Sequence, residues 1–244
     1  MIPKRSSPPE TALKTWLGVC TFLVFLMILL GGITRLSESG LSIVDWRPIT
    51  GWLPPLNTKD WTILFEAYRG SPEFKKLNFW MALEDFKHIY WLEYLHRLLG
   101  RIIGLIYFVP FVWFLVRYHV SKQLQVRFSF LLVLGTAQGF LGWYMVKSGL
   151  IDEPSVDHYR LAVHLGLAVV IYGILLFTLI SIRGHGHIEI PINLAKLLTS
   201  LVFLTILWGA FVSGLDGGKI YNTFPLMNGY VIPPESMQLT PIWL

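Results

Sequence analysis

The chain has 244 residues, a mean hydropathy of +0.56, 54% hydrophobic residues and only 14% charged residues. Soluble domains carry about 25% charged residues, so this composition excludes soluble enzymes, nucleic-acid-binding domains and disordered chains. The net charge of +5 does not indicate a nucleic-acid partner, because the basic residues lie in short clusters beside apolar blocks. We therefore expect an all-α integral membrane protein that lies in the lipid bilayer.

Five apolar blocks follow one another along the chain, each close to the roughly 20 residues that cross the hydrocarbon. They cover residues 16–33, 91–116, 128–146, 161–182 and 197–213. The first block is long and no small-residue cleavage pattern follows it, which favours a retained anchor over a cleaved signal peptide. The expected organisation is a tail at 1–15, a four-helix transmembrane unit at 16–182, and a segment at 183–244 that carries the fifth span.

Basic residues in the connections predict the orientation of the spans. One set of connections carries Lys4, Arg5, Lys14, Arg117, Lys122, Arg127, Arg183 and Lys196, and the short connections on the other side carry only Lys147, Arg160 and Lys219. The positive-inside rule then places the N-terminus in the cytoplasm. We expect a multi-pass protein of the cell (inner) membrane.

The long connection at residues 34–90 is rich in aromatic residues, so we expect it to fold. Asn57 or Thr58 can cap a short amphipathic helix that Gly70 ends, and Ser71-Pro72 is typical of a second helix start. The apolar faces of these helices predict a lid on the outer ends of the spans. The alternative is a loop that packs only on itself.

The chain contains an internal repeat with an offset of 178 residues. Residues 31–55 align without gaps on 209–233, so that Gly31 falls on Gly209 and Glu38 on Asp216. Duplicated units are common in membrane proteins. If this is one, a second unit starts near the fifth span and three more spans belong after Leu244, which predicts that the chain stops early.

Two histidines lie inside spans and at similar depth. His96 is in the second span and His164 is in the fourth, and these spans run in the same direction. Ionisable residues inside a membrane mark functional sites, and two imidazoles at one level suit axial ligation of a haem iron. For a single buried histidine, a hydrogen-bonded structural role is the alternative.

Charged residues flank His96 on the same predicted helix. Glu93 lies on nearly the same face, where it can orient the imidazole, act in the chemistry, or extend to water. Arg97 and Arg101, one turn apart, can clamp haem propionates. Their alternative role is pairing with loop carboxylates such as Glu84 or Asp85.

Several motifs resemble those of haem A synthase in its mitochondrial and alphaproteobacterial form. They are GGITRLSESGLS at 31–42, DWRPITG at 45–51, EYLHRLLGR at 93–101 and AVHL at 162–165, and the similarity extends through 209–233. The resemblance implies eight spans in two four-helix halves, of which this chain holds the first half and the fifth span. It also implies oxidation of the C8 methyl of haem O, through a hydroxylated intermediate, to the formyl group of haem A for terminal oxidases.

The resemblance also implies roles for individual residues. His96 and His164 match the histidines assigned to the substrate haem, and Glu93 matches a glutamate near the reacting edge of the porphyrin. A haem b belongs to the second half, whose histidines would follow Leu244. Haem O synthase, oxidase assembly factors and further copies of the chain are the partners to consider. Unlike some relatives, this chain has no cysteine pair in its outer loops, since Cys20 is its single cysteine. The alternative function is a haem-binding electron carrier or assembly protein without catalysis.

Overall fold

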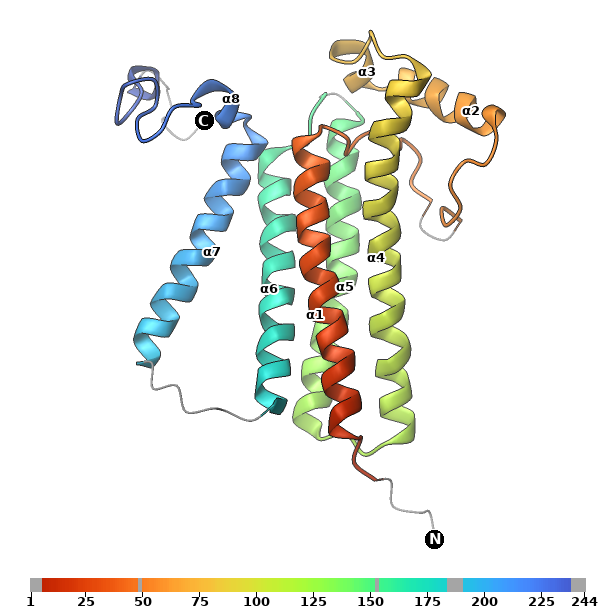
Figure 1. Ribbon diagram of the computed structural model, residues 1–244, viewed down its shortest axis with the longest axis vertical. Helices are drawn as coiled ribbons and strands as arrows, with labels where there is room; N and C mark the ends of the chain where they lie inside the picture. The colour runs from red at the N-terminus through yellow and green to blue at the C-terminus, as the bar shows by residue number, and fades with distance from the viewer. Residues whose placement is uncertain (1–5, 48–49, 152–153, 184–190, 238–244) are drawn as a thin grey trace.

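The computed structural model describes residues 6–47, 50–151, 154–183 and 191–237. Within these ranges the secondary structure is helical, with one isolated β-bridge and no strands. Four long helices, α1 (Glu10–Leu36), α4 (Leu83–Arg117), α5 (Lys122–Gly149) and α6 (His158–Arg183), form an antiparallel bundle, and α7 (Ile192–Gly214) lies beside α6 (Figure 1). All five helices are long and apolar enough to cross a membrane, which confirms the predicted five-span, all-α class.

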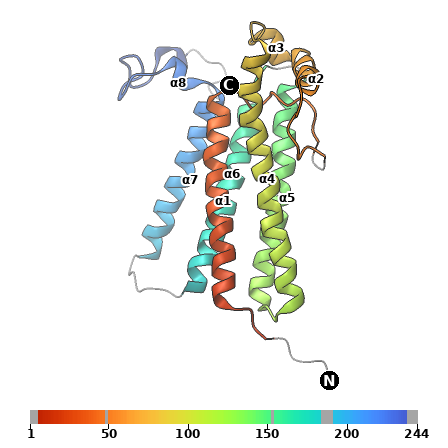
Figure 2. The same ribbon diagram turned by 45° about the vertical axis from the view of Figure 1, so that its right-hand side comes forward.

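The order of the helices around the bundle decides which side chains can meet. Helix α1 packs against both α4 and α6, and α5 packs against α6 and, less extensively, against α4. The same neighbours are visible in Figure 2 after the turn of the view. Helices α4 and α6 are therefore diagonal partners, and side chains that point inward from them approach each other across the interior.

The two ends of the bundle differ in how they are filled. At the end where α1 begins, the ring of Trp16 contacts those of Tyr107, Phe114 and Phe128, and its Nε1 donates a hydrogen bond to the carbonyl of Ile106 at 2.9 Å. At the other end, called here the lid end, α1 and α7 end and α6 begins. Aromatic side chains thus fill the interior between the helices at the end where α1 begins.

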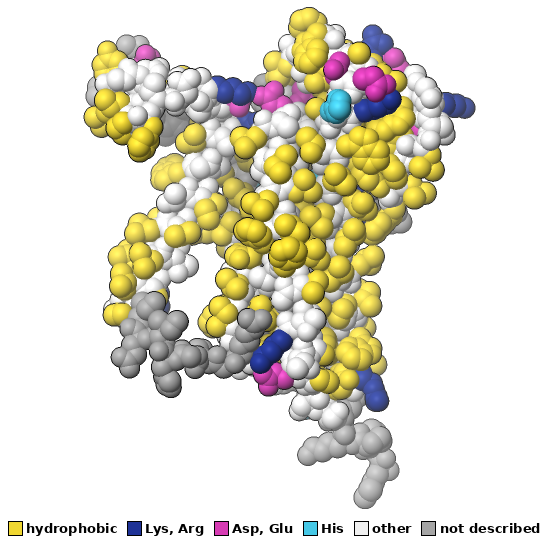
Figure 3. Space-filling model, in the orientation of Figure 1, with side chains coloured by type: hydrophobic (Ala, Val, Ile, Leu, Met, Phe, Trp, Pro, Cys, Tyr) yellow, Lys and Arg dark blue, Asp and Glu magenta, His cyan; other side chains and the backbone are white. Residues whose placement is uncertain are grey.

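The outer surfaces of the spans are apolar. Large side chains such as Phe22, Leu105 and Phe140 are exposed, and apolar side chains cover the middle of the molecule while charged groups gather at its two ends (Figure 3). Exposed apolar surface on this scale requires an apolar solvent. The distribution agrees with a protein that spans the bilayer.

Two short helices form the lid, as the sequence predicts. Helix α2 (Thr58–Arg69) is capped by Asn57, whose side chain accepts a hydrogen bond from the amide of Asp60 at 2.9 Å, and ends at Gly70. Helix α3 (Pro72–Lys76) is capped by Ser71. Both predicted starts are confirmed.

The lid packs on one helix rather than over all the spans. Its aromatic side chains form a cluster with the first turns of α4, whose buried members are Tyr68, Phe74, Phe86, Ile89, Tyr90 and Tyr94. This cluster explains why α4 begins at Leu83, before the predicted span at 91–116.

The other spans also continue past the expected hydrocarbon limits, and α1 begins at Glu10, within the expected tail. Helix α8 (Gly217–Ile220) and the 3-10 helix η1 (Pro234–Met237) follow α7.

Candidate functional site

His96 and His164 come from the diagonal helices α4 and α6, and both lie in the interior near the lid end. Both side chains are partly buried. Their placement follows from the helix order, since α1 and α5 separate α4 from α6 on either side. The structure thus brings together the two histidines that the sequence singled out, although it does not by itself assign them a ligand.

Each imidazole lies against a glycine of a neighbouring helix. A Cβ atom on Gly31 of α1 would lie 3.3 Å from Nε2 of His96, and a Cβ atom on Gly142 of α5 would lie 3.0 Å from Cε1 of His164. Any side chain at either glycine would push against a ring. All four helices therefore contribute to one site: two supply an imidazole and two supply the space beside it.

Gln138 is a site residue that the sequence reasoning missed. It lies one turn from Gly142 on α5, and its amide nitrogen donates to the backbone oxygen of His164 at 3.0 Å and lies 3.4 Å from Nε2 of the ring. Nδ1 of His164 and Oε1 of Gln138 are buried without a hydrogen-bond partner among the described residues. A glutamine in an apolar span, spaced four residues from a glycine, was the signal that could have found it.

Glu93 is buried in a hydrogen-bonded network and does not extend to water. It is 2% exposed, and its Oε2 accepts hydrogen bonds from Ser42 Oγ at 2.7 Å and from the amide of Ile43 at 2.8 Å. Its Oε1 accepts from Nε of Arg97 at 2.9 Å. The alternative of an interfacial glutamate in contact with solvent is therefore wrong. The carboxylate holds the chain that leaves α1 against α4, and the hydrogen bonds described for it do not include His96.

Arg97 and Arg101 point toward the loop that follows α1. Arg97 donates to the carbonyl of Ile43 at 2.9 Å, and Arg101 donates to the carbonyl of Arg47 at 3.0 Å. The guanidinium of Arg101 also lies 5.8 Å from the centre of the Trp52 ring. Both arginines therefore bind the loop that follows α1, and the charge of Arg97 is balanced by Glu93.

Among the described residues, the two loop carboxylates considered as alternative partners of these arginines are bound elsewhere. Glu84 forms an ion pair with Lys87 at 2.7 Å, and Asp85 accepts from the amide of Ala82 at 2.9 Å. Both carboxylates therefore make their contacts at the start of α4. Pro48 and Ile49, which belong to the motif at 45–51, lie outside the described residues.

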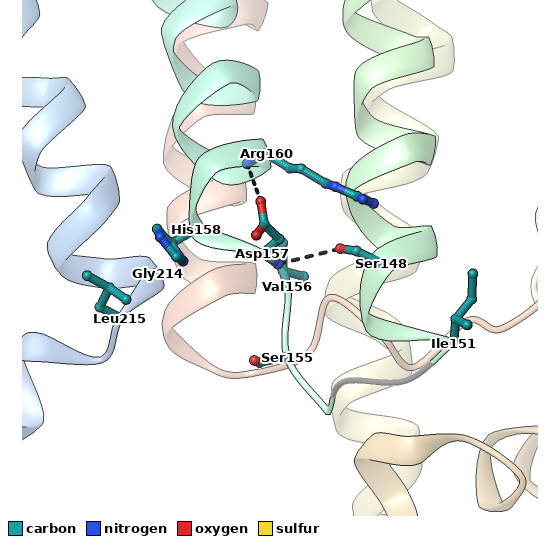
Figure 4. A pocket seen from close by; sticks show the side chains of 9 residues that line it. All are labelled: Ser148, Ile151, Ser155, Val156, Asp157, His158, Arg160, Gly214 and Leu215. Atoms are coloured by element: carbon teal, nitrogen blue, oxygen red, sulfur yellow. Dashed lines mark hydrogen bonds between the residues drawn. The ribbon is translucent and has the colours of Figure 1, made fainter. Parts of the chain in front are cut away.

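A cavity of about 470 Å³ lies between the lid ends of α5, α6 and α7. Asp157 caps α6 there, since its carboxylate accepts from the amide of Arg160 at 2.8 Å, and its own amide donates to Ser148 Oγ at 3.5 Å (Figure 4). His158 lines this cavity, but none of the predicted site residues does. The histidine pair and the cavity are therefore separate features.

Fold and site together define a class: a multi-pass helical membrane protein whose four-helix bundle brings two imidazoles together near one end. The cytochrome oxidase assembly protein family matches residues 14–244, and the chain belongs to this family. The heme A synthase of Nitrosospira multiformis is 48% identical over 239 residues, which are 95% of this chain and 67% of that protein.

Two further heme A synthases agree with this assignment. The protein of Rhodospirillum centenum is 47% identical and the protein of Parvibaculum lavamentivorans is 48% identical, over 99% and 98% of this chain. The chain spans 66% and 71% of their respective lengths. It therefore corresponds to about two thirds of each of these relatives. No solved structure matches it.

Proposed function

We propose that this chain is a haem A synthase that holds haem O between His96 and His164 and takes part in oxidising the C8 methyl of the porphyrin to a formyl group. The proposal rests above all on two partly buried imidazoles that the diagonal helices α4 and α6 contribute near the lid end. Neutral imidazole is a strong ligand for haem iron. The relatives named heme A synthase support the choice of substrate.

The surroundings of the two histidines fit a porphyrin. Gly31 and Gly142 place no side chain against ring atoms of His96 and His164, and a buried ring nitrogen of His164 has no hydrogen-bond partner among the described residues. Bound iron would be held by His96 and His164. Arg97 and Arg101 supply positive charge for the propionates, to which guanidinium groups bind in bidentate fashion.

Glu93 is the residue to which we assign a direct role in the chemistry. The two oxidation steps, methyl to hydroxymethyl with water as the source of oxygen and hydroxymethyl to formyl, each release two protons and pass two electrons to an external electron acceptor. A carboxylate held in place by Arg97 and by two neutral donors can stabilise positive charge that develops on the substrate, or accept a proton. The haem b of the family is expected beyond this chain.

Orientation and location follow from the charge pattern. We place the N-terminus in the cytoplasm and the lid end, with the histidine pair, at the outer face of the cell membrane. Haem O synthase and oxidase assembly factors, which produce and receive the porphyrin, remain predicted partners, as does a second copy of the chain.

Haem binding and product analysis test the proposal. The 244-residue chain is purified with haem O, and the bound pigment is measured by absorption and identified by mass spectrometry after extraction. We expect stoichiometric low-spin haem in the unchanged chain and loss of haem in His96→Ala and His164→Ala. His119→Ala, in the connection between α4 and α5, is the matched control and should retain haem.

Glu93→Gln separates catalysis from binding. In the longest form of the protein that the gene encodes, this variant should bind haem O yet yield neither the hydroxymethyl nor the formyl product. Unchanged haem A production would exclude the role given to Glu93. Bound haem without conversion, in the unchanged protein as well, would favour the electron-carrier function.

A further inference from the structure

The chain that leaves α1 crosses the bundle to the diagonal helix α5. Helices α1 and α5 each pack against α4 and α6 and are therefore not neighbours. Leu41, five residues after the end of α1, is nevertheless 2% exposed and lies against Gly149, the last residue of α5. A Cβ atom on Gly149 would lie 2.6 Å from Cδ1 of this leucine. The residues between Leu36 and Leu41 thus cross the lid end of the bundle.

From Leu41 to Arg47 the chain, called here the connecting segment, is bound to α4 by several hydrogen bonds. The carboxylate of Glu93 accepts from the amide of Ile43 at 2.8 Å, and the guanidinium of Arg97 donates to the carbonyl of Ile43 at 2.9 Å. Further along, Arg101 of α4 donates to the carbonyl of Arg47 at 3.0 Å. The connecting segment is therefore held firmly on its α4 side.

The connecting segment meets α5 through two apolar side chains. Leu41 lies against Gly149, and the ring of Trp46 lies 5.6 Å from the ring of Trp143. Trp46 is 51% exposed, and tryptophan is typical of the boundary between bilayer and water. The α5 side of the segment thus carries apolar contacts where the α4 side carries charged hydrogen bonds.

Helices α4 and α5 meet directly only at the opposite end of the bundle. There the hydroxyl of Tyr107 donates to the carbonyl of Phe128 at 2.7 Å, and the ring of Phe111 lies 6.4 Å from the ring of Phe128. Within the described ranges, no hydrogen bond or ring contact joins α4 directly to α5 at the lid end. At that end the two helices are joined through the connecting segment.

The connecting segment lies at the depth of the histidine site. On α4, Arg97 directly follows His96, and on α5, Trp143 directly follows Gly142, the glycine beside the ring of His164. Because an α-helix rises 1.5 Å per residue, these contacts lie within one turn of the imidazoles. The segment therefore covers the side of the bundle between α4 and α5 where the histidines are.

We infer that the connecting segment is a gate, through which the substrate porphyrin passes sideways between the lid-side half of the bilayer and the histidine pair. The other three sides of the bundle are closed by extensive helix packing, and a large apolar ring partitions into the bilayer. The gate stays attached to α4 and opens where Trp46 parts from Trp143. The inference rests on the proposed function for the identity of the molecule that passes.

Reversible cross-linking of the gate tests this inference. Trp46→Cys and Trp143→Cys are combined with Cys20→Ser, which removes the single native cysteine. The chain in a lipid nanodisc is treated with a short, reducible thiol cross-linker, haem O is supplied in vesicles, and its uptake is followed by absorption. We expect the cross-linked chain to lose most of its uptake and reduction to restore it. Haem O that is loaded before cross-linking should stay bound.

Tyr159→Cys with Phe211→Cys, also in the Cys20→Ser background, is the matched control. These two rings lie 5.7 Å apart and join α6 to α7 at the same end of the bundle. Cross-linking them should leave haem uptake unchanged. Equal uptake rates in the chains cross-linked at 46–143 and at 159–211 would overturn the gate.

Trp46→Ala weakens the gate without a cross-linker. Removing one aromatic contact should speed haem uptake about 2- to 10-fold. Because the contact is closed before and after binding, release should speed up by the same factor and the affinity should stay the same. Unchanged uptake, with or without a change of affinity, would show that Trp46 does not hold the gate closed.

A measurement without haem separates this inference from the proposed function. If the unchanged chain takes up no haem, the proposed function fails, and spin labels on the two cysteine pairs still test the gate. Electron paramagnetic resonance should give a broader distance distribution for the 46–143 pair than for the 159–211 pair. Equal widths would mean that the connecting segment does not open.

Discussion

Two segments related by the 178-residue repeat begin alike and then diverge. Helices α1 and α7 end at equivalent residues, Leu36 and Gly214, and the next residues have nearly equal backbone angles, with φ of −87° at Ser37 and −91° at Leu215. Glu38 and its counterpart Asp216 follow, both with φ of 53°. The two segments therefore have the same backbone conformation from the ends of α1 and α7 as far as Glu38 and Asp216.

Beyond the carboxylates, the surroundings of the two segments differ. The first segment, 31–55, lies against α4, where Glu93 and Arg97 bind Ser42 and Ile43, and the hydroxyl of Tyr94 donates to the carbonyl of Trp52 at 2.6 Å. The second segment, 209–233, is bound mainly to itself, through a bridge between Met227 and Tyr230. Phe224, the counterpart of Trp46, is 98% exposed.

The difference separates local from tertiary causes. Similar short sequences suffice to end a helix and to place an acidic residue in the left-handed region. The rest of the first segment is held in place because α4 presents the buried carboxylate of Glu93 and the guanidinium of Arg97 to its backbone.

The largest effect is expected from Glu93→Ala. This change removes the acceptor for Ser42, Ile43 and Arg97 and leaves a largely buried guanidinium unpaired, which should cost about 3–5 kcal/mol. Thermal unfolding and hydrogen exchange of residues 40–47 would measure the loss. The counterpart change in the second segment, Asp216→Ala, should cost less than about 1 kcal/mol because Asp216 and one of its two partners, Lys219, are exposed. Equal losses would contradict the contrast.

The lid, which follows only the first segment, should loosen as the pH rises. Burial raises the pKa of Glu73 from 4.5 to about 7, and the hydrogen bond from Tyr68 only partly offsets this effect. The stability of the neutral form is then fully present below about pH 4.5 and is lost as the pH rises through about 7. The loss amounts to at most about 3 kcal/mol.

Hydrogen exchange of residues 58–78 between pH 5 and 8, corrected for intrinsic rates, measures this loosening. The neighbouring acidic groups Glu93 and Glu38 raise the pKa of Glu73 further, so the change is assigned by Glu73→Gln. That variant should make protection of the lid independent of pH. Loosening with the same midpoint in Glu73→Gln would show that another group is responsible.

Gly31→Ala and Gly209→Ala form a matched pair across the repeat. A Cβ atom at Gly31 would lie 3.3 Å from the ring of His96, so the imidazole must shift by a few tenths of an ångström, whereas a Cβ atom at Gly209 meets no atom within 4 Å. We expect a several-fold loss of haem affinity and a shifted absorption band for Gly31→Ala alone. Identical spectra in the two variants would show that Gly31 does not support His96.

The smallest effects are expected where the two segments touch. Arg35 donates to the carbonyl of Ser213, its own counterpart in the repeat, and pairs with Asp216, while Lys219 pairs with Glu38. Arg35→Ala should lower stability by about 1 kcal/mol, since the arginine is mostly buried. Lys219→Ala should produce no measurable change in thermal unfolding, because Lys219 is exposed. A larger effect from Lys219 than from Arg35 would reverse this ranking.

Much of the architecture was predictable from the sequence, because it depends on local patterns. The five apolar blocks predicted five spans, and Asn57 and Ser71 predicted the starts of the lid helices. Other features were not predictable, because they depend on pairs of residues that only packing brings together. Gln138 on α5 could be recognised as a site residue only after packing placed it beside the imidazole of α6. The sequence likewise left open whether Glu93 would contact water, His96 or Arg97.

The sequence alone determined that this protein is a helical membrane protein with five spans, and it singled out two histidines inside those spans. Hydropathy and capping depend on neighbours along the chain, so they can be read without coordinates. Only the tertiary structure decided that α4 and α6 are diagonal, that Glu93 holds the first segment of the repeat, and that glycines rather than side chains lie beside the rings. Those outcomes depend on how four helices pack around one another, and the pattern of a single helix does not contain that information.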